Sequence, residues 1–234
     1  MSQRFGVEIE FKSVPKIVAA LRIGAALGVD HVHCFGYKST KCSLCNRSVP
    51  KEAAYDAWSV MTDRTVTDSR GDLEVGGEAI SPILTVDNFD QINMIANTLQ
   101  ELGASVNLVT GLHVHVEMSN LTSQQRINVL TEWFKQEGSF FEEVENHRSI
   151  NSQCESYADK KQEQDNLIAE FANGNSGRAA RLSEITSKQR SMSVVSYPTL
   201  GTFEFRLHHG TLHAPTIQAW ITRLLTFVDN AKGE

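Results

Sequence analysis

The sequence predicts an α+β fold with one principal β-sheet, and three observations lead to this class. Apolar and polar residues alternate near the start, in the middle and near the end of the chain, in RFGVEIEF (4–11), LHVHVE (112–117) and TFEFRLH (202–208). Helix-like patterns separate these strands, so strands and helices alternate irregularly along the chain. The 234 residues, of which 41% are hydrophobic, suffice for one ordinary core. We therefore expect a single catalytic-size domain over residues 1–234.

Capping residues and turn formers give the bounds of the first predicted elements. A strand over 4–11 precedes an amphipathic helix over 15–27, with Ser13 as its cap and Gly28 as its stop. A polar stretch over about 36–57 carries cysteines and has no period, so we interpret it as an insertion. Turn formers over 68–77 predict a second loop. Further strands are expected at 31–35, 58–61, 65–67, 78–84, 105–109, 112–117, 191–197 and 202–208.

The remaining helices are also recognised by their ends. The helix predicted over 86–102 ends before Gly103, and the one over 214–231 has Pro215 in its first turn. Thr122 is a good cap for a helix over 122–135. Other helices are expected at 139–146, 159–172 and 178–187.

Charge and hydropathy exclude some classes of protein. The formal net charge is −6, which argues against a general nucleic-acid binder with a basic face. No apolar run approaches the roughly 18 residues that span a membrane. The N-terminus leads directly into a strand-like run, without the pattern of a signal peptide. We therefore expect a cytoplasmic chain that binds neither nucleic acid nor membrane.

Three predicted strands each carry ionisable side chains on one face and apolar side chains on the other. Residues two apart in a strand point the same way, so the polar members of each strand project together. A solvated outer face is the alternative interpretation, since antiparallel sheets often face water on one side. Adjacent carboxylates repel one another unless a cation lies between them, which favours a metal-binding face. The polar members are Glu8 and Glu10, then His113, His115 and Glu117, then Glu204 and Arg206.

The chemical types of the candidate ligands indicate which metal ion they would bind. Carboxylates outnumber imidazoles on these strands, which favours Mg²⁺ or Mn²⁺ over Zn²⁺. Arg206 shares its face with Glu204, and a guanidinium beside a divalent cation suits a transferring phosphoryl group. This combination points to ATP chemistry. A metal-dependent hydrolase with zinc on the His113-x-His115 strand remains an alternative.

Four segments resemble the amidoligases, in the superfamily of glutamine synthetase and glutamate–cysteine ligase. They are FGVEIEF (5–11), GGEAISP (76–82), TGLHVHVE (110–117) and GTFEFRLHHGT (201–211), and they occur in the family's order. The resemblance extends over residues 4–231 and includes WSVMTD (58–63) and the closing helix with Trp220.

This resemblance implies a fold and a reaction. The fold is a curved antiparallel β-sheet with helices packed on one face, like the catalytic domain of glutamine synthetase. The reaction is ATP-dependent joining of a carboxylate and an amine through an acyl phosphate. Arg206 and Glu204 are the implied catalytic residues, with Arg206 on the transferring phosphate. The implied ligands of ATP-bound Mg²⁺ or Mn²⁺ are Glu8, Glu10, Glu78, His113 and Glu204.

Other residues are candidates for nucleotide or substrate contacts: His115, Arg148, Arg190 and Asp63. Arg148 lies in a stretch similar to the family's Arg-x-x-Asn-x-x-Cys, although an exposed loop arginine is an equal alternative. Around Arg190 the chain departs from the family pattern, with Ser191 in place of a tyrosine and Val195 near an expected asparagine.

The clustered cysteines form a separate candidate site. A CxxC pair with a nearby cysteine or histidine can complete a tetrahedral structural zinc site. The pattern is a His-x-His-Cys run (31–34), then seven residues, then a CxxC pair (42–45). The candidate ligands are His33, Cys34, Cys42 and Cys45, and reduced loop thiols are the alternative. Cys154 lacks the surroundings of a nucleophile.

Several alternatives stay open on the sequence alone. ATP-dependent phosphoryl transfer to another small acceptor uses the same residues, and a degenerate member serving as a binding module is a non-enzymatic option. The acid and the amine could be small molecules or peptides. The sequence does not specify an oligomeric state.

Overall fold

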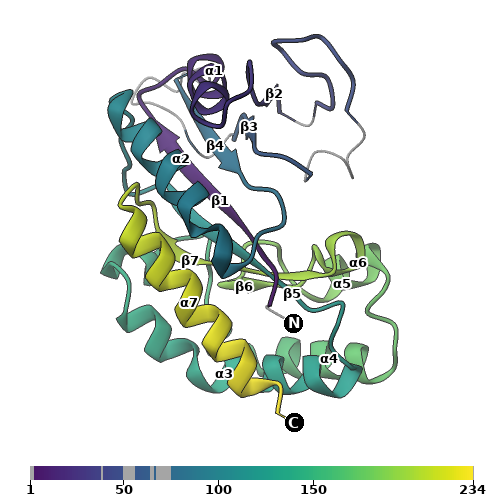
Figure 1. The fold of residues 1–234 in the computed structure, drawn as a ribbon. Coiled ribbons are helices and arrows are strands. Elements are labelled where there is room, and N and C mark those ends of the chain that lie inside the picture. Colours follow the sequence, from purple (N-terminus) through teal and green to yellow (C-terminus); the bar gives the residue numbers. More distant parts are fainter. Residues whose placement is uncertain (1–2, 38, 50–55, 64–65, 67–74, 234) are drawn as a thin grey trace. The chain divides into compact units, whose positions relative to one another are not determined.

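The computed structural model describes residues 3–37, 39–49, 56–63, 66 and 75–233 (Figure 1). The chain forms two compact units, the first of Met1–Leu112 with Gly210–Trp220 and the second of His113–His209 with Ile221–Glu234. Helices and mostly antiparallel strands occur in a mixed order. This confirms the α+β class.

The described residues of the first unit include four strands in the order β2-β3-β4-β1. These are β1 (Phe5–Lys12), β2 (His33–Phe35), β3 (Ser59–Met61) and β4 (Gly76–Ile80). β4 pairs antiparallel with both β1 and β3, while β2 and β3 are parallel. In this register Glu10 lies directly opposite Glu78, and Met61 is Glu78's partner on the other side.

The helices α1 (Lys16–Ala26) and α2 (Phe89–Glu101) lie in the first unit. α1 packs against β3 and against α2, which follows the short 3-10 helix η2 (Val86–Asn88) (Figure 1). Gly28 and Gly103 follow these helices with φ of 75° and 78°, in the left-handed region that glycine adopts readily. The predicted stop signals are therefore confirmed.

The second unit contains three strands in the order β5-β7-β6. These are β5 (Gly111–Glu117, whose first two residues belong to the first unit), β6 (Met192–Ser193) and β7 (Thr202–His209). β6 and β7 pair antiparallel, with Ser193 opposite Glu204. The helices of this unit are α3 (Ser123–Glu142), the 3-10 helix η3 (Asn146–Ile150), α4 (Lys161–Ala172), α5 (Ala179–Ile185), α6 (Tyr197–Leu200) and the latter part of α7 (Ala214–Ala231).

An aromatic cluster forms the core between α3, β7 and α7. The Trp133 ring lies 5.0 Å from the Phe205 ring and 5.5 Å from the Phe227 ring, centroid to centroid, and both pairs meet edge to face. Figure 1 shows α3 beside α7, and the Asn128 side chain donates to the Lys232 carbonyl at 3.0 Å. The strongly apolar alternation of β7 thus buries one face of the strand in a packed core.

Four predicted elements differ from the structure. Residues 105–109 form no strand, because the Asn107 side chain accepts hydrogen bonds from the N–H groups of Val109 and Thr110 and closes a turn. The helices predicted over 122–135 and 139–146 are one helix, α3, which continues through Gly138 to Glu142. Residues 191–197 contain only the two-residue strand β6 before α6 begins.

Two turn predictions also need correction. Ser13 does not cap α1, because Pro15 occupies the N-cap position without a side-chain hydrogen bond. Gly76 and Gly77 lie in β4 rather than in a loop. A Cβ on Gly77 would come within 2.6 Å of the Met61 carbonyl oxygen, so glycine is required where β3 and β4 approach. The rest of the predicted loop, 68–74, lies outside the described residues, as do residues 65 and 67 of the short strand predicted there.

In the predicted insertion, the described residues 39–49 form a small hairpin-like turn, with isolated bridges between Lys41 and Ser48 and between Phe35 and Cys42. Among the residues described, no helix has both the length and the apolar character needed to cross a membrane.

Candidate functional site

The first unit gathers three carboxylates on its central strands. Oxygen atoms of Glu10, Asp63 and Glu78 all lie within 4.8 Å of one another. Glu10 is on β1, Glu78 is opposite it on β4, and Asp63 follows β3 by two residues. Strand pairing therefore brings together residues that are 15 to 68 positions apart in the sequence.

Burial makes this arrangement costly for the protein alone. The exposed fraction is 2% for Glu10 and 8% for Glu78, while Asp63 is half-buried. Glu10 Oε2 accepts a hydrogen bond of 2.7 Å from the N–H of Gly111, which orients its carboxylate. Like charges directly opposite each other across an antiparallel pair destabilise a sheet. A hard divalent cation with oxygen ligands, such as Mg²⁺ or Mn²⁺, fits this donor set.

The observed group differs from the set of metal ligands predicted for the first unit. Asp63, expected as a nucleotide or substrate contact, stands beside Glu10 and Glu78 as a potential metal ligand. Glu8 shares a face of β1 with Glu10 but is half-exposed, and its Cα partner is Ile80. Its role as a metal ligand stays a prediction.

In the second unit, β5 and β7 place a histidine, a carboxylate and a guanidinium together. His113 Nδ1 lies 3.8 Å from Glu204 Oε1, and Arg206 Nη1 donates to the same oxygen. Arg206 Nε also donates to the Gln153 carbonyl at 3.2 Å. Exposed fractions of 3%, 2% and 8% for His113, Glu204 and Arg206 show that the alternative of a solvated face is wrong here.

The other polar residues of β5 have different partners. His115 Nδ1 lies 3.0 Å from the Thr202 hydroxyl, and Ser119 donates to Glu117 at 3.0 Å. His113 and His115 therefore differ in burial and in partners, since His113 is buried against Glu204 and His115 is half-exposed beside a hydroxyl. The predicted single face of Glu8, Glu10, His113, His115, Glu204 and Arg206 involves residues of both units and stays a prediction.

Arg148 is among the most buried side chains of the second unit, with an exposed fraction of 1%. Its guanidinium donates to two β7 carbonyls, at 3.0 Å to Leu207 and 2.7 Å to Arg206. The alternative of an exposed loop arginine is therefore wrong. Arg148 supports the strand that carries Glu204 and Arg206, and its contact with substrate stays a prediction.

The Cys154 thiol donates to the Arg148 carbonyl at 3.2 Å. Burial raises the pKa of this thiol, although the positive charges of Arg148 and Arg206 act in the opposite direction. A thiol held in its protonated form is a poor nucleophile.

Arg190 lies in an ion-pair network. Its guanidinium donates to Glu163 at 2.6 Å and to Glu155 at 2.9 Å. Burial alone would lower the pKa of Arg190, but the hydrogen bonds and charge of Glu163 outweigh it and raise the pKa. These contacts tie α4 to the segment before β6, and the predicted nucleotide or substrate contact of Arg190 stays a prediction.

Sequence reasoning missed the buried carboxylate of Glu137 on α3, whose exposed fraction is 3%. It accepts hydrogen bonds from the Ser156 hydroxyl at 2.5 Å, from the Tyr157 N–H at 2.9 Å and from the Ser191 hydroxyl. Ser191 in turn accepts from the Trp133 indole at 3.3 Å. A carboxylate four residues after a buried tryptophan, on the same helix face, is the sequence signal that could have indicated it.

The cysteine cluster forms with one change of membership. Ligand atoms of His31, His33, Cys42 and Cys45 all lie within 4.8 Å of one another. The predicted member Cys34 is not in the group, and burial raises the pKa of its thiol to about 11. His31, from the His-x-His pair, takes its place.

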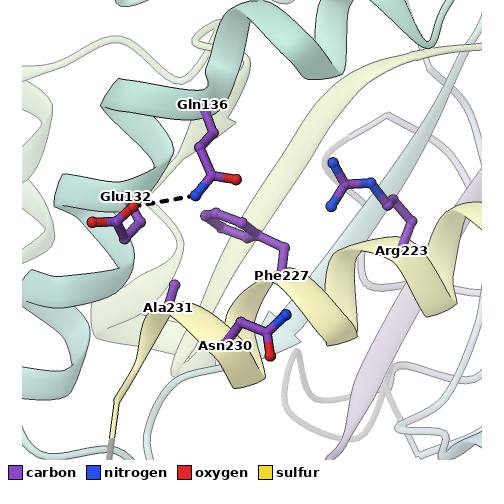
Figure 2. Close-up of a pocket in the computed structure, with 6 residues that line it drawn as sticks. All are labelled: Glu132, Gln136, Arg223, Phe227, Asn230 and Ala231. Atoms are coloured by element: carbon purple, nitrogen blue, oxygen red, sulfur yellow. Dashed lines mark hydrogen bonds between the residues drawn. The ribbon is translucent and has the colours of Figure 1, made fainter.

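A pocket in the second unit lies elsewhere. It is lined by Glu132 and Gln136 of α3 and by Arg223, Phe227, Asn230 and Ala231 of α7 (Figure 2). Its charged groups are engaged in protein contacts, since Gln136 donates to Glu132 and Arg223 pairs with Glu143 at 2.9 Å. None of the predicted site residues lines it, so it is not the candidate site.

A comparison with protein families identifies the class and then the family. A family model described as "putative amidoligase enzyme" matches residues 1–228. This is an enzyme family, and its description indicates ligase-type chemistry. The chain belongs to this family, which confirms the resemblance to the amidoligases. Searches of curated proteins and of solved structures find no match.

Proposed function

We propose that this chain is an ATP- and Mg²⁺-dependent carboxylate–amine ligase. The observation that carries the proposal is the group of Glu10, Asp63 and Glu78 in a chain that belongs to an amidoligase family. Magnesium in ATP-using enzymes is bound through a few carboxylates together with substrate phosphates. Three carboxylates held on paired strands provide such a set.

Each polar group has a proposed task. Glu10, Asp63 and Glu78 hold Mg²⁺ or Mn²⁺ in the first unit, where Glu8 is a further ligand. In the second unit His113 and Glu204 are proposed as ligands, and Arg206 stabilises negative charge on the phosphoryl group in transfer. A bound divalent cation neutralises phosphate charge. The contact between Glu204 and Arg206, with Arg148 behind the strand, supports a fixed orientation of the guanidinium.

The proposed reaction has two steps. An oxygen of the substrate carboxylate attacks the γ-phosphorus of ATP, and ADP leaves. The amine then attacks the carbonyl carbon of the acyl phosphate. Inorganic phosphate leaves with the former carboxylate oxygen, and the amine loses a proton.

The finer features predicted from the family are part of the same proposal. They are a curved sheet with helices on one face, as in the glutamine synthetase catalytic domain, a cytoplasmic location, and small-molecule or peptide acids and amines as partners. The separate surroundings of His113 and His115 do not favour a zinc hydrolase built on both. Phosphoryl transfer to another acceptor would give a phosphorylated product rather than an amide.

The test is ADP release by the full chain in a screen of acids and amines with Mg²⁺ and ATP. We expect release that requires both an acid and an amine, and its loss in Glu10→Gln. Glu101→Gln, an exposed carboxylate at the end of α2, is the matched control and should keep full activity. With an ¹⁸O-labelled acid, one label should appear in inorganic phosphate.

Some outcomes would reject the proposal. Undetectable binding of ATP in the presence of Mg²⁺ would refute ATP chemistry at any site. ADP release without amide formation, with a phosphorylated acceptor, would replace the ligase by a phosphotransferase.

A further inference from the structure

A second potential metal site lies in the first unit, where His31 and His33, just before and at the start of β2, meet the CxxC turn of Cys42 and Cys45. We propose that His31, His33, Cys42 and Cys45 bind one structural Zn²⁺. The site is independent of the proposed ligase function, because none of its residues belongs to the catalytic set.

The distances suit a tetrahedral ion. One nitrogen or sulfur from each of the four side chains lies within 4.8 Å of the others, and Cys45 Sγ is 3.9 Å from His33 Nδ1. Zinc bonds of about 2.0–2.3 Å place tetrahedral ligands roughly 3.3–3.8 Å apart. Small side-chain rotations therefore close the site, and the two-nitrogen, two-sulfur set is typical of zinc.

The backbone around the cysteines is already shaped for a metal. The Cys42 N–H donates to the Arg47 carbonyl at 2.9 Å, the Asn46 N–H donates to the Cys42 carbonyl at 3.0 Å, and Asn46 has φ of 61°. The N–H of Cys34 points at Cys42 Sγ, 3.4 Å away, and the N–H groups of Cys45 and Leu44 also donate to this sulfur. N–H groups aimed at a sulfur stabilise the thiolate, which is the form that binds metal.

The backbone that carries His31 and His33 is also held in position by its neighbours. β2 pairs with β3 at His33, opposite Ser59. A Cβ on Gly24 would lie 2.3 Å from the Cα of His31, so this glycine lets the chain pass directly against α1. His31 and His33 are half-buried and Cys42 is buried, which leaves the site partly shielded from water.

A metal would explain how this segment holds its shape. The apolar cluster beneath it is small, with Phe35, Cys42 and Val49 buried and Leu44, Cys45 and Met61 packed around them. Small units with little core commonly add a structural metal. Four protein ligands leave no open position, so the ion is structural and does not act on substrate.

The experiment measures metal in the full-length protein purified without chelator. We expect about one zinc per chain, and loss of most of it in Cys45→Ser and in His31→Asn. Cys34→Ser is the matched control, because its thiol is buried beside the cluster without joining it, and it should retain zinc.

Cobalt substitution tests the ligand set even if a variant is unstable. Co²⁺ in the wild-type chain should show sulfur charge-transfer absorption of two thiolates, unchanged in Cys34→Ser and halved in Cys45→Ser. Zinc far below one per chain together with no Co²⁺ spectrum would overturn the proposal. Equal loss in Cys34→Ser and retention in His31→Asn would overturn this ligand set. Neither result bears on ATP turnover.

Discussion

Two groups of carboxylates in this chain have different surroundings. In the first unit Glu10, Asp63 and Glu78 are brought next to one another. In the second unit Glu137 is surrounded by hydroxyl and N–H donors, and Glu204 is paired with Arg206. A buried carboxylate met by donors contributes to the stability of the fold. Repulsion between neighbouring carboxylates lowers stability and weakens when a cation binds between them, which is the expected behaviour of a functional site.

The largest expected effect concerns catalysis at the paired group. Arg206→Lys keeps the positive charge but loses the planar contacts with Glu204 and the Gln153 carbonyl. We expect ADP release in the acid-and-amine screen to fall by roughly 10²–10³-fold. Arg223→Lys, which alters the surface pair with Glu143, is the control and should retain activity. Full activity in Arg206→Lys would remove Arg206 from the mechanism.

Glu137→Gln should have the largest effect on stability. The amide group would turn an N–H₂ toward donors that now point at a carboxylate, from Ser156, Tyr157 and Ser191. We expect the free energy of unfolding in urea to fall by about 1.5–3 kcal/mol. Glu132→Gln, on the surface of the same helix, should change it by less than about 0.5 kcal/mol. If the two variants behave alike, the donors around Glu137 contribute nothing.

Protonation of His208 should contribute to the pH dependence of the free energy of unfolding. Burial lowers the pKa of this β7 histidine from its ordinary 6.5 to about 4, with further lowering by His209 and Arg148, although the hydrogen bond to the His209 carbonyl opposes the shift. Between these values the unfolded chain binds more protons than the folded chain, so stability is lost as pH falls below 6.5. We expect a loss of about 1.5 kcal/mol between pH 6.5 and 5. Urea unfolding of His208→Gln over the same range should lack this component, and an identical slope would exclude the assignment.

Glu78→Gln should give the smallest change in the free energy of unfolding. The sign of this change distinguishes carboxylates that repel one another, as proposed for Glu10 and Glu78, from a carboxylate paired with donors, such as Glu137. Without Mg²⁺, removing one of two opposed carboxylates should raise the free energy of unfolding by about 0.5 kcal/mol. Mg²⁺ with ATP should then stabilise the variant less than the wild type. Melting temperatures with and without Mg²⁺ and ATP measure both effects. Destabilisation of the metal-free variant would show that Glu78, like Glu137, is a structural carboxylate.

The sequence predicted what depends on periodicity and family pattern. Strands 4–11, 112–117 and 202–208, the closing helix and the amidoligase family could all be predicted from it. Local competition was harder to predict, as at Asn107, whose side chain replaces a strand by a turn. The sequence also could not show which of the candidate side chains strand pairing would bring within reach of one metal ion. Asp63 joined Glu10 and Glu78, and His31 replaced Cys34, because register and helix packing decide which side chains meet.

Gly24 illustrates how a single position can carry a constraint from another part of the chain. Alanine is a better helix former than glycine by about 1 kcal/mol, so a helix considered alone would gain from the exchange. In α1 the added methyl group would collide with the backbone at His31. In a library of random variants selected for stability, we therefore expect glycine alone to be retained at position 24. Variants there should also weaken zinc retention, although residue 24 contributes no ligand atom.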